Sequence, residues 1–377
     1  MPSLPVPTCY ATPSIGAPDT PLRSKLEAIS QAGFEGIELG FPDLLSFAKE
    51  YHDDRKDQSS LDSDYDALCE AAGQVKAICE DLKLKIVMMQ PFANFEGWDE
   101  GSKEREDAFT RAKGWIRIMG KLGCDMIQVR VSYALTPWAP TCGQRTTLID
   151  TKLTQAVQVG SSDSPHMNTD RTKIVNDLQT FSALLAPHNF RLAYENWCWS
   201  THAPDWSDVW DIVRRVDRPN VGLCLDTFQT AGGEWADPTT PSGLREDVGG
   251  GSREELEARY TKSLEELARM VPKEKIYILQ ISDGYKTRLN DEVDEGGKRP
   301  RAQWSSCLRP MPFDGGYLPI VEMARAVMET GFRGWWSMEV FDGGEDGTRM
   351  GKEEWKDMDG FARRAMGALE RLVDEAG

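Results

Sequence analysis

Eight short apolar runs alternate with stretches of helical periodicity along the chain, and this alternation limits the fold more than any other feature. The apolar runs lie near residues 6–10, 34–40, 84–91, 125–131, 190–196, 221–228, 276–283 and 334–341. Strands that alternate with helices form parallel sheets whose faces the helices cover. Eight such units in 377 residues predict a (β/α)8 TIM barrel, organised as one domain over residues 1–377.

An open, doubly wound sheet is the main alternative, because it is built from the same strand–helix units. The first strand of such a sheet is typically followed by a GxGxxG turn, and the sequence after residues 6–10 has none. Three polar segments, at 136–168, 232–251 and 284–316, interrupt the alternation, which then resumes. We interpret them as extended loops after the fourth, sixth and seventh strands of the barrel.

Four of the predicted strands end on side chains that carry oxygen atoms: Glu195, Asp226, Gln280 and Glu339. The C-terminal ends of barrel strands form the active-site face, and neighbouring strands lie about 4.8 Å apart. We therefore expect these four side chains to converge. Three carboxylates at close range repel one another unless a divalent cation neutralises them, and oxygen ligands suit Mg²⁺ or Mn²⁺ better than zinc.

Each of these residues also has a simpler explanation when it is taken alone. A carboxylate that ends a strand often caps a helix or anchors a loop, and Asp226, which Thr227 follows, fits a helix cap equally well. The prediction of a metal site depends on the four residues occurring together on consecutive strands. The sequence contains no HExxH, GxSxG or P-loop signature that would compete with it.

Further polar and aromatic residues fall where the rim of the barrel is expected. Glu38 and Gln90 end predicted strands, and Arg130 lies on the fourth strand. Trp304 is one of several tryptophans placed to wall a pocket, and we predict that these four residues bind substrate. His202 lies in the loop that follows the fifth strand. We predict a catalytic role for it, with a solvated loop histidine as the competing interpretation.

Charge and composition exclude several classes of partner. With 44 basic and 61 acidic residues, the formal charge is −17, which argues against binding of nucleic acid or anionic membranes. No apolar run reaches the roughly 18 residues of a membrane span, and the first residues do not form a secretory signal. Eight cysteines occur singly, as free thiols do in a reducing compartment, so we expect a cytoplasmic protein with a small-molecule partner. The sequence leaves assembly into a homo-oligomer open.

Six segments follow one another along the second half of the chain: YENWCWSTH, RPNVGLCLDTFQTAG, LQISD, WSSCLR, GGYLP and SMEVF. In this order they resemble the fungal 3-dehydroshikimate dehydratases of the sugar phosphate isomerase/epimerase (xylose isomerase-like) TIM-barrel superfamily. The similarity covers nearly the whole chain from residue 22, apart from 136–168. It implies a divalent metal ion held by Glu195, Asp226, Gln280 and Glu339, which are the residues already reached from the strand ends.

The resemblance further implies that the protein removes water from 3-dehydroshikimate, a cyclic hydroxy-keto acid, to give the aromatic product protocatechuate. Such a reaction needs a Lewis acid for the ketone, a base for the α-proton and an acid for the departing hydroxyl. Arg309, in WSSCLR, would hold the substrate carboxylate. Some bacterial relatives have a histidine three residues after the metal-binding Asp, where this chain has Gln229.

Two other functions stay open at this point. A metal-dependent keto-sugar isomerase or epimerase on the same scaffold would use Glu195 and Glu339 as an acid/base pair on opposite faces of the substrate carbon. A barrel without catalytic activity would serve only as a binding partner. The intact side chains at all four strand ends argue against this last function.

Overall fold

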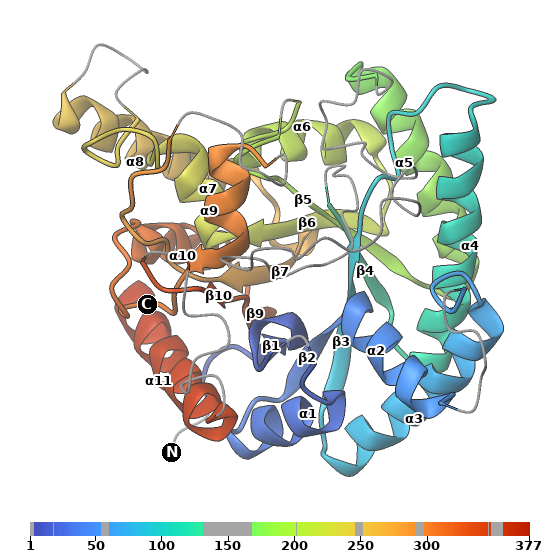
Figure 1. Ribbon diagram of the computed structural model, residues 1–377. Coiled ribbons are helices and arrows are strands. Elements are labelled where there is room, and N and C mark those ends of the chain that lie inside the picture. The colour runs from blue at the N-terminus through green and yellow to red at the C-terminus, as the bar shows by residue number, and fades with distance from the viewer. Residues whose placement is uncertain are drawn as a thin grey trace.

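The predicted (β/α)8 barrel is confirmed by a computed structural model, which describes residues 4–17, 19–53, 60–130, 168–200, 202–245, 252–290, 298–345, 347 and 357–377. Eight parallel strands close into a barrel in chain order, and the last strand pairs with the first (Figure 1). These strands are β1 (Thr8–Ala11), β2 (Gly36–Gly40), β3 (Lys85–Phe92), β4 (Met126–Arg130), β5 (Arg191–Glu195), β6 (Val221–Asp226), β7 (Ile276–Ile281) and β9 (Trp335–Met338). The predicted loop at 136–168 lies outside the described residues, apart from residue 168.

Helices surround the barrel, and α11 lies between α10 and α1, where it closes the ring (Figure 1). The helices are α1 (Leu22–Gln31), α2 (Phe41–Tyr51), α3 (Tyr65–Asp81), α4 (Lys103–Leu122), α5 (Arg171–Leu185), α6 (Trp206–Val216), α7 (Thr227–Glu234), α8 (Arg253–Met270), α9 (Pro300–Cys307), α10 (Ile320–Glu329) and α11 (Met358–Ala376). Among the described residues, none of these helices combines the length and the apolar character needed to span a membrane.

The barrel interior explains why polar side chains collect at one end of the strands. Cys9, Met88, Met126, Ala193 and Cys224 belong to a buried apolar cluster that is separate from the main core. Side chains two residues apart on a strand point to the same face. The positions two residues further along β3, β4, β5 and β6 therefore lie directly above this cluster, and they are Gln90, Gln128, Glu195 and Asp226.

The structure adds elements that the sequence pattern did not predict. Helix α2 directly follows β2, α7 directly follows β6, and α9 lies inside the segment 284–316 that we predicted to be a loop. Because α7 begins at Thr227, β6 ends at Asp226 rather than near residue 228. A small antiparallel sheet also forms between β8 (Leu308–Arg309) and β10 (Phe341–Asp342), in which Arg309 pairs with Phe341.

A buried ion pair joins the helices that follow the first two strands, α1 and α2. Lys25, on α1, donates to the Asp43 carboxylate over 2.8 Å, and both side chains are buried. The Thr12 hydroxyl, just after β1, donates to the other oxygen of Asp43 over 2.6 Å and accepts from the Gly40 N–H, at the end of β2, over 3.0 Å. This network fixes α1 and α2 against the barrel mouth.

Asp43→Asn should destabilise the protein by about 3–5 kcal/mol, because it leaves the buried Lys25 ammonium without a counter-ion while keeping the shape of the side chain. Urea unfolding followed by circular dichroism would measure the change. The matched control is Glu375→Gln, which removes a carboxylate from the exposed Arg371–Glu375 pair of α11 and should cost below about 1 kcal/mol. Equal effects of the two variants would contradict the structural importance of the Lys25–Asp43 pair.

Candidate metal centre

Three carboxylates converge at the C-terminal mouth of the barrel. Glu195 and Asp226 are the last residues of β5 and β6, and Glu339 directly follows β9. One oxygen from each lies within 4.8 Å of the other two, and all three side chains are fully buried. The convergence expected from the strand ends is therefore present in the structure.

Asp226 serves two structural purposes at once. Its Oδ1 accepts from the backbone N–H groups of Phe228 (2.7 Å) and Gln229 (3.1 Å), so it caps the N-terminus of α7. Its Oδ2 accepts from Arg309 over 2.6 Å. Burial raises the pKa of this carboxyl group, and Arg309 opposes the increase by favouring the charged form. Asp226 is therefore both a helix cap and a member of the carboxylate cluster, so the two interpretations made from the sequence are compatible.

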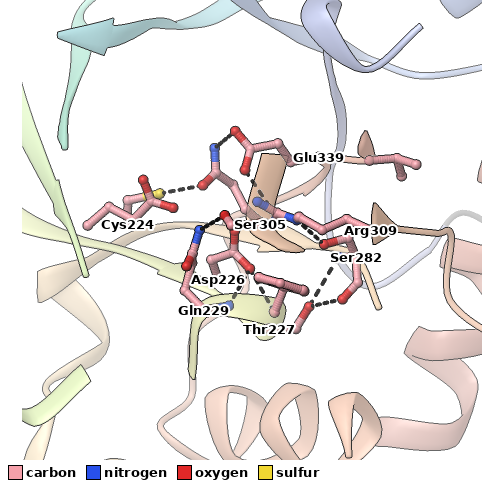
Figure 2. A network of polar contacts seen from close by, with 12 residues as sticks. Cys224, Asp226, Thr227, Gln229, Ser282, Ser305, Arg309 and Glu339 are labelled. Atoms are coloured by element: carbon pink, nitrogen blue, oxygen red, sulfur yellow. Dashed lines mark hydrogen bonds and ion pairs between the residues drawn. The ribbon is translucent and has the colours of Figure 1, made fainter. Parts of the chain in front are cut away.

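Arg309 lies between two of the three carboxylates (Figure 2). Its Nη2 is 2.6 Å from Asp226 Oδ2 and 3.1 Å from Glu339 Oε2, and its Nε donates to Ser282 Oγ over 2.8 Å. The guanidinium also faces the rings of Phe228 and Phe341, and the side chain is 1% exposed. The contacts seen here are internal, and the role in holding a substrate carboxylate stays a prediction.

Glutamine amides and a fourth carboxylate, that of Glu38, contact the three carboxylates, and together these side chains form what we call the polar layer. Gln90 Nε2 donates to Glu339 Oε1 over 3.1 Å and lies 3.5 Å from Glu38 Oε2. Gln280 Nε2 donates to the same two acceptors, over 3.2 and 2.8 Å. Glu38 and Gln90, which we predicted at the rim, are therefore buried partners of the carboxylate cluster.

Gln128 belongs to this layer, although the sequence analysis did not single it out. Its Nε2 donates to Glu195 Oε2 and to Gln280 Oε1, each over 3.1 Å, and its side chain is fully buried. The available signal was a polar residue within the apolar run DMIQVRV. In this arrangement the Gln280 amino group faces Glu339. Ligation of a metal by the Gln280 oxygen would therefore require its amide to rotate by half a turn.

The charges of this layer fit a divalent cation. Among the described residues, the contacts above join four buried carboxyl groups, those of Glu38, Glu195, Asp226 and Glu339, to a single arginine. Buried carboxylates are costly unless cations or hydrogen bonds compensate them. All the convergent donors are oxygen atoms, which suits Mg²⁺ or Mn²⁺. The donor set thus fits the predicted metal, whose identity the structure does not specify.

The remaining predicted residues occupy different environments. His202 is buried rather than solvated, so the competing interpretation of a solvated histidine is wrong, and neither ring nitrogen has a hydrogen-bond partner in the part of the chain that the structure describes. Burial, with a smaller contribution from Arg171, lowers the pKa of His202 to about 4. Trp304, on α9, is fully buried against Phe228 and donates to the Tyr285 carbonyl. The backbone of Arg130 pairs with β5, and its side chain lies outside the description.

Comparison with known proteins gives a consistent assignment. A curated 3-dehydroshikimate dehydratase of Neurospora crassa is 31% identical over 331 residues, which are 85% of this chain and 81% of that protein. A 3-dehydroshikimate dehydratase of Pseudomonas aeruginosa is 28% identical over 86% of this chain, but only 36% of that longer protein is covered.

Solved structures show the same fold at lower identity. The IOLI protein, crystallised with a bound zinc atom, superposes with a TM-score of 0.62 at 17% identity, over 98% of this chain and 99% of that one. The model of the xylose isomerase-like TIM barrel family matches residues 26–359. The chain therefore belongs to the xylose isomerase-like TIM barrel family.

Proposed function

We propose that this protein is a metal-dependent lyase that removes water from 3-dehydroshikimate, or from a similar cyclic hydroxy-keto acid, to give an aromatic product such as protocatechuate. The observation that carries the proposal is the buried carboxylate cluster of Glu195, Asp226 and Glu339 in a chain that aligns with most of a fungal 3-dehydroshikimate dehydratase. The cluster supplies a place for the Lewis acid, and the relative indicates the substrate class.

The carboxylates of Glu195, Asp226 and Glu339 would hold the metal. Gln280 would be the fourth ligand once its amide has rotated to turn the oxygen toward Glu339. When bound, Mg²⁺ or Mn²⁺ supplies a Lewis acid that polarises the ketone and so acidifies the neighbouring C–H bond. Hydrogen bonds from Gln128, Gln90 and the α7 backbone hold the carboxylates in fixed orientations, as outer partners of metal ligands usually do. Arg309 adds a fixed positive charge beside Asp226 and Glu339.

His202 is our candidate for the proton transfer. Burial lowers its pKa to about 4, so the imidazole is neutral at pH 7 but is a weaker base than an ordinary histidine. Its proposed acceptance of the proton from the carbon next to the ketone therefore depends on the Lewis acid, which would acidify that C–H bond. In the proposed reaction that proton passes to the imidazole and then to the departing hydroxyl, which leaves as water. The cyclic dienone that results becomes aromatic when a proton moves from a ring carbon to the ketone oxygen. The imidazole gains and loses one proton in each turnover, so the enzyme returns to its starting state.

Purified protein with Mn²⁺ or Mg²⁺ should convert 3-dehydroshikimate to an aromatic product, which its ultraviolet absorbance reports, and EDTA should stop the reaction. Return of activity on addition of excess metal separates metal removal from denaturation. Absence of product with metal present would overturn the lyase proposal. Turnover of ketoses under the same conditions would then support the isomerase or epimerase alternative, in which Glu195 and Glu339 transfer the proton.

Glu339→Gln should weaken Mn²⁺ binding by at least roughly 10–100-fold, because loss of a ligand costs no less than loss of an outer hydrogen-bond partner. Isothermal titration calorimetry on the apo protein measures this independently of activity. Glu375→Gln, at a half-exposed carboxylate of α11, is the matched control and should bind Mn²⁺ like the wild type. Unchanged affinity of the Glu339 variant would show that the cluster is not the metal site.

The wild-type protein should lose stability relative to His202→Gln as the pH falls from about 6.5 to about 4. The pKa of His202 is depressed in the folded state, so the unfolded state binds the extra proton in this window and the difference reaches about 3 kcal/mol at its lower end. Denaturant unfolding at pH 7 and pH 5 measures the effect, with the exposed His188→Gln as control. Parallel pH profiles for wild type and His202→Gln would contradict a buried, neutral imidazole.

A further inference from the structure

Gln229 joins three parts of the site through one buried side chain and its own backbone. It lies on α7, three residues after Asp226, and is 1% exposed. Its N–H donates to Asp226 Oδ1 (3.1 Å), its Oε1 accepts from the Cys198 N–H (3.1 Å), and its Nε2 donates to Ser305 Oγ (3.1 Å). Figure 2 shows the contact with Ser305 beside Asp226.

The first segment that Gln229 holds lies between β5 and α6, and we call it the loop 196–204; residue 201 lies outside the described residues. Asn196 donates to the Pro204 carbonyl across the base of this loop, and Ser200 Oγ accepts from the N–H of His202 over 3.3 Å. Trp197, in the same loop, donates through Nε1 to Glu195 Oε2 over 3.2 Å. These internal bonds make the loop one unit that carries His202 and contacts a predicted metal ligand.

The second segment is α9 together with the residues on either side of it. Ser305 lies on α9, which runs directly into β8 and Arg309. Just before the helix, Arg299 donates to the carbonyl of Trp199, in the loop after β5. The loop and α9 are therefore tied by this direct contact and by the bridge through Gln229.

We infer that Gln229 is a positioning residue that locks the loop 196–204 and α9 onto the capped end of α7. The amide uses its oxygen and one of its two N–H donors on these two segments. It has no ionisable proton, so we place its role in holding its neighbours rather than in proton transfer. Loss of the amide would weaken the support of the loop that carries His202 and of the helix that leads to Arg309, while the backbone cap on Asp226 and the direct contacts of Arg309 remain. The kinetic consequence rests on the proposed dehydratase function, whereas the lock itself does not.

The test compares Gln229→Met, which keeps the length of the side chain and removes both bonds, with Ser305→Ala, which removes one. Ser306→Ala is the matched control, because the Ser306 hydroxyl contacts Gln303 and Lys298 on its own segment. Hydrogen–deuterium exchange of the intact protein, read by mass spectrometry, should show about tenfold faster exchange in peptides covering 196–204 for Gln229→Met, the factor that a buried hydrogen bond supplies. Ser305→Ala should give a smaller increase, and Ser306→Ala none.

With 3-dehydroshikimate as substrate, Gln229→Met should lower kcat about tenfold with little change in KM and with Mn²⁺ affinity retained. Faster exchange limited to the loop 196–204 and α9 supports the lock even if no dehydratase activity is found in the wild type. Unchanged exchange in this loop, or an equal increase across all peptides of both Gln229→Met and Ser305→Ala, would overturn it. An altered loop with an unchanged kcat would likewise refute its part in positioning the catalytic groups.

Discussion

The rest of the site depends on the burial of four carboxyl groups at the mouth of one barrel. Glu38, Glu195, Asp226 and Glu339 have no exposed surface, and such groups are destabilising unless cations and hydrogen bonds compensate them. The structure supplies a guanidinium, three glutamine amides and the N-terminus of a helix. The amides and the helix dipole provide partial positive charge beside these carboxylates, and a divalent cation would add to this compensation.

Helix α7 connects the Asp226 carboxylate to the surrounding structure. Its positive end faces Asp226, and the carbonyl groups of its last three residues each accept from a different arginine. Arg301 contacts the Gly232 carbonyl, Arg245 that of Gly233, and Arg259 that of Glu234. Cations at the C-terminus and an anion at the N-terminus both favour the helix. The contacts at both ends stabilise α7, and the helix in turn holds Asp226 through the N–H groups of its first turn.

Helix α7 also illustrates the difference between features that the local sequence predicts and features that depend on tertiary contacts. Eight strands and the convergence of Glu195, Asp226 and Glu339 follow from apolar runs and their last residues, because the strand period and the barrel geometry are local and regular. TFQTAGGE, the sequence of α7, contains two glycines and two threonines and has low intrinsic helix propensity. It is helical because Asp226 caps it and neighbouring elements bury it, which are tertiary effects. The pairing of Arg309 with Asp226, 83 residues apart, has no local signal either.

Arg309 also bears on the charge of the substrate in the proposed reaction. Among the contacts described above, it carries a full positive charge beside Asp226 and Glu339. Without this charge a substrate carboxylate would be repelled more strongly, because charges interact strongly in a site of low dielectric constant. Under the proposed dehydratase function, Arg309 would therefore favour an anionic substrate through its charge, whether or not it touches the substrate carboxylate. A neutral ketose would not benefit from this charge, which supports a hydroxy-keto acid over a sugar as the proposed substrate.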